Sequence, residues 1–457
     1  MTCMKWLKKV DLHGRLKQLK QLKKLPLWKN YTKWEWAIMI IGGLTIFYIL
    51  INLFTAFGEQ NLPPQATEKI TLENSDDFEN SLAASINSSV ELGSSVSILT
   101  NGEEFLPDLL QEIKKAEKSI YITDYIWDGG QFGNQLFQAL IEKAKEGVEV
   151  KVLLDGVSGG HASKKYIKEL TLLGGEVAYF RPVSWWDLSR IDRRTHVRDF
   201  VIDGNTSYLG GIAISDLWLG NATSSKSWHD FMFKTHGVMA SRLESVFENM
   251  WSQTTGEILA APLKVSSSST ITNSTHFVSL FSAPAPDMSS NVEHFIWMSI
   301  VAAKTSIHIE NPYLLPSKSI REALETKAKE GVDVSIIVPG KNTDTKYTRW
   351  ASQSFYKELL RAGVKIYEYQ PSRIHAKIMT IDGIWSVIGS ANLDNRSSKL
   401  NLELIIGIED KIFAKDLEGK FNEDLKKASE ITKEAWSSHS YLLLPLELVS
   451  RLFIRQY

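Results

Sequence analysis

The chain has 457 residues, of which 43% are hydrophobic and 23% charged, values typical of a folded globular protein and not of a disordered chain. Its single cysteine, Cys3, excludes an intramolecular disulfide bond and a cysteine-rich zinc site. The net charge of −1 excludes a chain-wide basic field, so we expect no nucleic-acid partner.

The charge is distributed unevenly along the chain. Residues 1–35 carry ten basic and two acidic side chains, a net charge of +8, whereas the remainder carries 42 basic and 51 acidic side chains, a net charge of −9. Leucines alternate with lysines in this basic segment, which fits either a surface helix on anionic lipid or a solvated basic tail. The leucines in question are Leu16, Leu19, Leu22 and Leu25.

Residues 36–57 contain no charged side chain. A helix of this length spans roughly 33 Å, enough for a hydrocarbon core of about 30 Å. We expect an uncleaved transmembrane anchor, in preference to a buried core helix or a cleaved signal peptide, whose apolar region is usually shorter. Because basic flanks stay cytoplasmic, we expect the N-terminus in the cytoplasm and the remaining chain outside it, at the cell membrane in a bacterium.

The next segment, 58–95, is polar, contains Pro63 and Pro64, and predicts a stalk. Beyond it the chain repeats itself in three matched blocks that occur in the same order. The clearest pair is KAKEGVEVKVLLDG at Lys143–Gly156 and KAKEGVDVSIIVPG at Lys327–Gly340.

Each repeat alternates short β-branched runs with amphipathic stretches that end at glycine, which predicts strands and helices in alternation. The predicted fold class is α/β, with two pseudo-twofold-related halves, each a mainly parallel mixed sheet flanked by helices. The halves are expected at 96–262 and 277–437, joined by a linker at 263–276. An amphipathic tail at 438–457 fits either an interfacial anchor or a segment packed on the body.

A histidine motif closes each repeat. Residues two apart on a strand point to the same face, so each imidazole projects beside a cation, which favours an anion between them. A Gly-Ser-x-Asn turn adds N–H groups, a hydroxyl and an amide for phosphate oxygens. Two such motifs at one site could divide nucleophilic attack and leaving-group protonation between two histidines. The motif residues are His196, Arg198, Asp203, Gly211 and Ala213 in the first half, and His375, Lys377, Asp382, Ser390 and Asn392 in the second.

The second motif, HxK(x)4D(x)6GSxN, makes residues 96–437 resemble the phospholipase D superfamily. Three further strings are similar to those of bacterial cardiolipin synthases: Ile191–His196, Trp228–Asp230, and Asn392–Ser397 followed by Asn401-x-Glu403. The resemblance implies a phosphohistidine mechanism without metal or cofactor. It also implies phosphatidylglycerol and the membrane as partners; the oligomeric state is not indicated.

The resemblance further implies a role for each motif residue. His196 would be the nucleophile and His375 the general acid and then base, although the reverse order is equally compatible with the sequence. Glu403 would orient His375, and Asp230 would orient His196. Asp203 and Asp382 would fix the loops. Phosphate would be held by Arg198, Lys377, Ser390 and Asn392.

Two departures from the family pattern occur in the first half. Arg198 replaces the usual lysine, and Ala213 replaces the asparagine of the turn and offers no side-chain donor. The functional alternatives are therefore phosphatidyl transfer between two phosphatidylglycerols, hydrolysis by a phospholipase or nuclease, and a weakened pseudoenzyme.

Two tryptophans and several histidines lie outside the motifs. Trp185 and Trp186 fit either a lipid-facing loop or a packed one. The other histidines show no metal-ligand spacing, and we expect them to be structural or on the surface. These are His13, His161, His236, His276, His294, His308 and His439.

Overall fold

The computed structural model describes residues 31–54, 62, 70–183, 191–259, 275–282 and 290–437. Most of the predicted basic segment, the linker up to residue 274, Trp185 and Trp186, and the tail at 438–457 lie outside these residues. The described chain forms two compact units, Met1–Gly58 and Glu59–Tyr457.

The first unit contains one described helix, α2 (Lys33–Phe54). Its large apolar side chains are exposed, among them Ile38, Leu44 and Phe47. Within the described residues, no helix combines the length and apolarity needed to cross a membrane. The structure thus does not show the predicted transmembrane anchor, which stays a prediction from the sequence.

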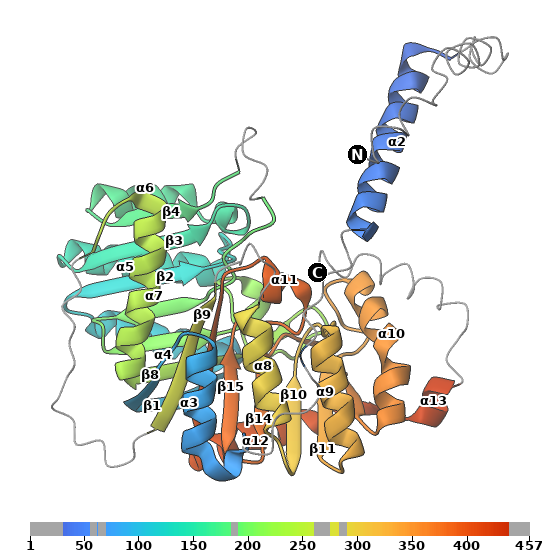
Figure 1. Cartoon of the computed structure of the whole chain (residues 1–457). Helices are drawn as coiled ribbons and strands as arrows, with labels where there is room; N and C mark the ends of the chain where they lie inside the picture. Colours follow the sequence, from blue (N-terminus) through green and yellow to red (C-terminus); the bar gives the residue numbers. More distant parts are fainter. Residues whose placement is uncertain are drawn as a thin grey trace, which may run out of the picture. The chain divides into compact units, whose positions relative to one another are not determined.

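The second unit is built on one mixed sheet of 15 strands (Figure 1). Their order is β17-β12-β11-β10-β14-β15-β16-β9-β1-β8-β6-β5-β2-β3-β4. The strands of the first half are β1 (Val90–Thr100), β2 (Ser119–Asp124), β3 (Glu149–Asp155), β4 (Glu176–Phe180), β5 (Asp199–Ile202), β6 (Thr206–Gly210) and β8 (Phe231–Gly237). Those of the second are β9 (Thr275–Ser282), β10 (Ser306–Glu310), β11 (Asp333–Pro339), β12 (Lys365–Tyr369), β14 (Ile378–Ile381), β15 (Trp385–Gly389), β16 (Glu403–Glu409) and β17 (Ala428–Ile431).

The two halves repeat the same strand order, as the sequence predicts, except that β17 of the second half has no counterpart in the first. In each, three parallel strands (β2-β3-β4 and β10-β11-β12) lie beside an antiparallel hairpin (β5-β6 and β14-β15). The first strands of the halves, β1 and β9, pair antiparallel and join the halves into one sheet. The pseudo-twofold relation therefore passes through the middle of the sheet.

Helices cover both faces of this sheet. In the first half they are α4 (Asn101–Lys115), α5 (Gln131–Lys145), α6 (Lys164–Leu172) and α7 (Val238–Thr255). In the second they are α8 (Asn291–Val301), α9 (Lys318–Lys329), α10 (Lys346–Ala362), α11 (Asn395–Lys399), α12 (Lys411–Leu425) and α13 (Lys433–Ser437). Helices α5 and α9 end at glycine, as predicted. Gly147 and Gly331 have φ values of 87° and 95°, in the left-handed region that ends a helix.

The segment predicted as a stalk is folded over much of its length. Helix α3 (Ser75–Ser85) packs Phe78, Leu82 and Ala83 into the same apolar cluster as α8, and β1 starts at Val90. The stalk prediction for 58–95 is therefore wrong from Leu72 onward. The acids and serines of this stretch hid apolar residues at helical spacing, which drive its burial.

Candidate active site

Each histidine motif is held by a turn that ties the hairpin to the neighbouring strand. Asp203 and Asp382 occupy the first turn position with φ of 51° and 55°, each followed by a glycine, as a type I′ turn requires. The Asp203 carboxylate accepts from the backbone N–H groups of residues 117–119, and the Asp382 carboxylate from those of 304–306, at 2.7–2.9 Å. Both carboxylates thus fix loop geometry, which agrees with their expected role.

Beside each histidine, the backbones of the two halves form hydrogen bonds with each other. The N–H of His196 donates to Leu402 O at 2.9 Å, and the N–H of His375 donates to His229 O at 2.7 Å. The second contact extends a two-stranded parallel ladder, β7 (Trp228–His229) with β13 (Arg373–Ile374). Each imidazole is therefore positioned by a strand of the opposite half.

Each histidine also pairs with a carboxylate of the opposite half. His196 Nδ1 donates to both carboxylate oxygens of Glu403 at 3.1 Å, and His375 Nδ1 donates to Asp230 Oδ2 at 2.7 Å. The pairing expected from the sequence, Glu403 with His375 and Asp230 with His196, is therefore wrong. The physical reason is the backbone crossing, which aligns each histidine with the residue next to Leu402 or His229.

Glu403 lies in a dense set of donors. Besides His196, it accepts from Ser390 Oγ at 2.5 Å, Ser397 Oγ at 2.7 Å and Asn401 Nδ2 at 3.4 Å. Burial alone would raise the pKa of Glu403, but His196 and the two hydroxyls lower it below its ordinary value. Glu403 is thus held ionised. Ser390, expected to bind phosphate, instead directs its hydroxyl to Glu403.

Asp230 is supported by residues that the sequence did not single out. Its backbone N–H donates to Asn101 Oδ1 at 3.1 Å, and Trp218 Nε1 donates to Asp230 Oδ2 at 3.4 Å. The neighbouring His229 contacts Asn101 through Nδ1 at 2.9 Å and Asp424 through Nε2 at 2.5 Å. The only sequence signal for this support was the string that contains His229.

The two cations lie beside the imidazoles, as predicted, although both pairs precede β5 and β14 and do not lie within a strand. Arg198 Nη2 is 3.3 Å from His196 Nε2, and Lys377 Nζ is 3.0 Å from His375 Nε2. Burial lowers the pKa of Lys377 to about 7, opposed by Asp230 and reinforced by Arg198. Burial and the charge of Lys377 lower the pKa of His375 to about 3, and burial lowers that of His196. Such a site favours the entry of an anion.

The turns after the two motifs differ. Asn392 is buried, and its side-chain oxygen has no hydrogen-bond partner among the described residues. The matching Ala213 is fully buried in an apolar cluster. Gly211, which matches Ser390, leaves room for the carboxylate of Asp230, because a Cβ there would lie 2.3 Å from both carboxylate oxygens.

Potential metal ligands gather elsewhere in the described chain. One group comprises Asp76, Glu79 and His276, and the other His229, Glu310 and Asp424. Neither group includes His196 or His375. His276 shows no metal-ligand spacing in the sequence, but the fold brings it close to Asp76 and Glu79.

The sequence of this chain is similar to those of known proteins over most of its length. The family model described as cardiolipin synthase, PLD-like domain, matches residues 109–251 and 296–425. A cardiolipin synthase of Geobacillus sp. (strain WCH70) is 38% identical over 367 residues, which cover 80% of this chain and 73% of that protein. A cardiolipin synthase of Clostridium perfringens (strain SM101 / Type A) is 33% identical over 372 residues, which cover 80% and 78%.

Among solved structures, phosphatidylserine synthase of Haemophilus influenzae Rd KW20 is similar with a TM-score of 0.66 and 16% identity, over 82% of this chain and 97% of that one. Polyphosphate kinase of Porphyromonas gingivalis is similar with a TM-score of 0.50 and 13% identity, over 82% and 53%. These likenesses concern the fold.

Proposed function

Because the chain belongs to the cardiolipin synthase family of phospholipase D-like phosphatidyltransferases, we propose that it converts two phosphatidylglycerols into cardiolipin and glycerol through a phosphohistidine. The observation that carries the proposal is the pair of buried histidines, each with Nδ1 on a carboxylate of the other half. This arrangement leaves both Nε2 atoms for chemistry at phosphorus.

In the first step, His196 Nε2 attacks the phosphorus of one phosphatidylglycerol. A P–N bond forms, and the bond from phosphorus to the headgroup glycerol oxygen breaks. His375, protonated on Nε2 once the phosphate anion has entered and offset the charge of Lys377, donates that proton to the oxygen. Glu403 supports the role of His196 as nucleophile, because an ionised carboxylate on Nδ1 fixes the proton there and stabilises the positive ring that forms. Arg198, Lys377 and Asn392 hold the phosphate oxygens.

In the second step, His375 accepts a proton from a hydroxyl of the second phosphatidylglycerol. The oxygen attacks phosphorus, the P–N bond breaks, and cardiolipin leaves with His196 restored. Water in place of the second lipid would yield phosphatidic acid, so the choice of acceptor separates a synthase from a hydrolase.

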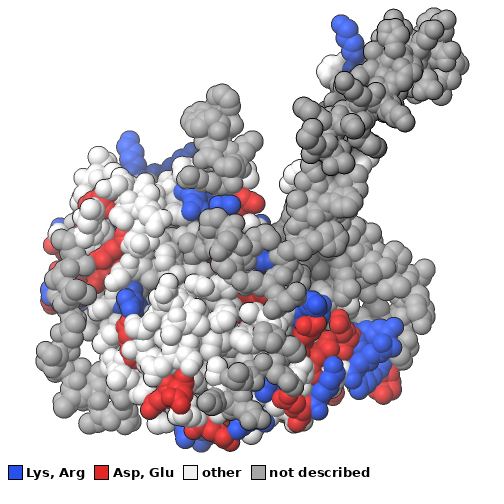
Figure 2. All heavy atoms as spheres, in the orientation of Figure 1, with Lys and Arg blue, Asp and Glu red and all other residues white. Residues whose placement is uncertain are grey.

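Membrane attachment completes the proposal. The basic residues at 1–35, the charge-free run at 36–57 and the exposed apolar side chains of α2 support a membrane anchor, with the N-terminus in the cytoplasm and the catalytic unit outside it. Figure 2 shows acidic and basic side chains interspersed at the lower right of the face that it draws. Arg321 of α9 pairs with Glu358 of α10 at 3.3 Å. A lipid substrate suits that surface better than a nucleic-acid backbone.

The test is incubation of the purified full chain with vesicles of radiolabelled phosphatidylglycerol, followed by separation of the products. We expect cardiolipin and glycerol, and no turnover from His375→Ala. Phosphatidic acid as the main product would assign hydrolysis instead, and no product from a folded wild-type chain would assign a pseudoenzyme. A reporter fused after Tyr457 that is active only outside the cytoplasm tests the topology.

A further inference from the structure

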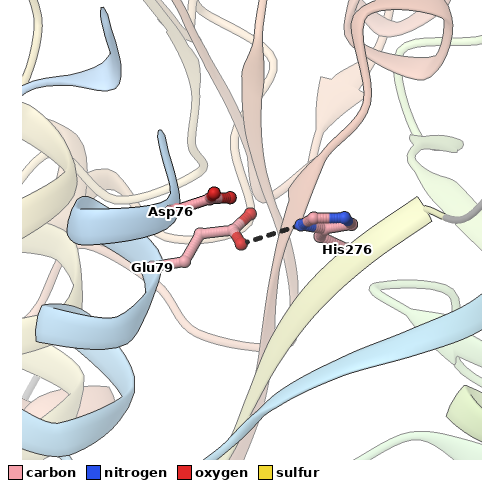
Figure 3. Close-up of side chains that lie close together, drawn as sticks. All are labelled: Asp76, Glu79 and His276. Carbon is pink, nitrogen blue, oxygen red and sulfur yellow. Dashed lines mark hydrogen bonds and ion pairs between the residues drawn. The ribbon is translucent and has the colours of Figure 1, made fainter. Parts of the chain in front are cut away.

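A second group of acidic and imidazole side chains lies away from the two-histidine site. Asp76 and Glu79 reach from α3 toward His276 on β9 (Figure 3). One possible ligand atom from each residue lies within 4.8 Å of the other two. Glu409, which faces His276 across the β9–β16 ladder, places Oε2 3.4 Å from His276 Nδ1. The cluster therefore joins a helix to the central strands of the sheet.

Glu79 is buried and has one carboxylate oxygen without a hydrogen-bond partner among the described residues, as a metal ligand would. Only 1% of it is exposed. Its Oε2 accepts from His276 Nδ1 at 3.1 Å, while its Oε1 has no hydrogen-bond partner within the described chain. An ionised carboxylate oxygen in such a position is costly unless a cation or a donor meets it. A buried acid with an unsatisfied oxygen thus points into the cluster.

The charges in the cluster are one-sided. Asp76, Glu79 and Glu409 supply the acidic groups, and His276 is the imidazole among them. Three carboxylates thus meet one imidazole, and a divalent cation would neutralise the excess.

We propose that Asp76, Glu79 and His276, with Glu409 beside them, bind a divalent metal ion of the Mn²⁺ class. Carboxylate oxygens suit Mn²⁺, and one imidazole shifts the preference away from Mg²⁺ and Ca²⁺, which favour oxygen alone. Ligand atoms around such an ion are about 3 Å apart when neighbouring and about 4 Å apart when opposite, so a cluster whose ligand atoms lie within 4.8 Å of one another needs to tighten by up to about 1–2 Å. On binding, the proton on His276 Nδ1 is released or moves to Nε2, because a ligating nitrogen must be unprotonated.

The second group of possible ligands comprises His229, Glu310 and Asp424. Both carboxylate oxygens of the buried Glu310 lack a hydrogen-bond partner among the described residues, but the other two members are already partnered. Asp424 already contacts Lys427 at 3.0 Å and His229 at 2.5 Å, so its charge is partnered within the chain. The Asp76–Glu79–His276 cluster is also partly open to solvent, since 29% of the His276 side chain is exposed. A metal there would fasten α3 to β9 and hold the segment that completes the apolar core of the second half.

The test uses the full chain, stripped with EDTA and dialysed, and MnCl2 as the probe. We expect one Mn²⁺ per chain by loss of the free-ion electron paramagnetic resonance signal, and a rise in Tm of about 2–5 °C at a hundredfold excess over Kd. Glu79→Gln should weaken Mn²⁺ binding about a hundredfold. The same variant in EDTA should unfold at or above the wild-type Tm, because it replaces a buried carboxylate with a neutral amide.

Asp77→Asn is the matched control, because Asp77 lies on the same helix outside the cluster and contacts Asn74 instead. It should bind Mn²⁺ like the wild type. The proposal is overturned if the wild type takes up no Mn²⁺, if Glu79→Gln binds as tightly as wild type, or if Ca²⁺ binds and Mn²⁺ does not. His196→Ala should take up Mn²⁺ normally, so the outcome is independent of the catalytic proposal.

Discussion

The two halves use the same scaffold with different chemistry at equivalent positions. In the first half, the backbone N–H of Ile214 donates to the Asp124 carboxylate at 3.1 Å; in the second, that of Leu393 donates to the Asn311 amide oxygen at 3.1 Å. The half with the carboxylate also has the guanidinium of Arg198. Burial raises the pKa of Asp124 to about 7, and the charge of Arg198 opposes that rise. The departure at Arg198 is therefore compensated within its own half.

The halves differ also in how they secure the exchanged carboxylates. Glu403 receives the hydroxyl of Ser390, whereas Asp230 occupies the space that a side chain at Gly211 would need. An apparent loss of the family motif in the first half is thus a change in the way the carboxylate is held. A departure from the family motif in one half is therefore explained by the carboxylate that this half provides for the histidine of the other half.

The largest expected effect separates the roles of the two histidines. With phosphatidylglycerol, His196→Ala and His375→Ala should each lose at least about a thousandfold in turnover. With a p-nitrophenyl phosphodiester, whose leaving group needs no proton, His375→Ala should still release nitrophenol in a burst, and His196→Ala should not. Stopped-flow absorbance measures the burst. A burst from His196→Ala alone would reverse the two roles.

The exchanged carboxylates come next. Glu403→Gln should lower kcat by about a hundred- to a thousandfold, and Asp230→Asn by less, because more donors converge on Glu403. Ser397→Ala removes one donor and keeps the carboxylate, so its loss should stay below about tenfold. Equal losses for Glu403→Gln and Ser397→Ala would show that the hydrogen-bond network, and not the carboxylate, supports His196.

Arg198 tests whether the first motif binds phosphate. Arg198→Met removes a charged hydrogen bond worth roughly 1.5–3 kcal/mol, so kcat/KM should fall about ten- to a hundredfold. Arg198→Lys keeps the charge beside Asp124 and restores the family residue, so activity should be retained. Wild-type kinetics in Arg198→Met would remove the first motif from the phosphate site.

Lys377 predicts a pH dependence that Arg198 does not share. With its pKa lowered by burial to about 7, Lys377 loses its proton and its positive charge as the pH rises above 7. The value of kcat/KM, which reports the free enzyme, should therefore decline between about pH 7 and 9. Lys377→Arg should flatten that decline, because arginine stays protonated over this range. An identical profile in both proteins would assign the titration to another group.

The smallest effect concerns the turn. From the sequence, Ala213→Asn is expected to be neutral or helpful, but Ala213 is fully buried among apolar side chains. We now expect the larger, polar side chain to cost about 1–3 kcal/mol of unfolding free energy, measured in urea. Asn392→Ala should lower activity and leave stability nearly unchanged, since the Asn392 side-chain oxygen has no hydrogen-bond partner in the described part of the chain.

The sequence was sufficient for what depends on local pattern. The repeat at Lys143–Gly156 and Lys327–Gly340 predicted β3 and β11, which are equivalent strands of the two halves. The spacing of His375 and Lys377 predicted that their side chains lie close together. The partner of each histidine was not predictable in this way. Glu403 lies 207 residues from His196, and Asp230 lies 145 residues from His375, so only the crossing of the halves determines the pairing.

The same limit hid the cluster around His276. Its hydrogen-bond partner Glu79 is 197 residues away, in a segment whose polar composition indicated a stalk. Phe78 and Leu82 carried a helical signal there, but the surrounding acids and serines outweighed it.

The exchange of carboxylates between the halves also affects the chain while it is being synthesised. The first half leaves the ribosome with His196 in place and Glu403 still untranslated. A nascent or truncated chain thus carries a histidine whose tautomer nothing fixes and whose positive intermediate nothing stabilises. On the proposed mechanism, such a chain should show no phosphatidyl transfer. Competence should arise only once β16, which begins at Glu403, has paired with β9 and β15, so a proteolytic fragment that ends before residue 403 should be inactive.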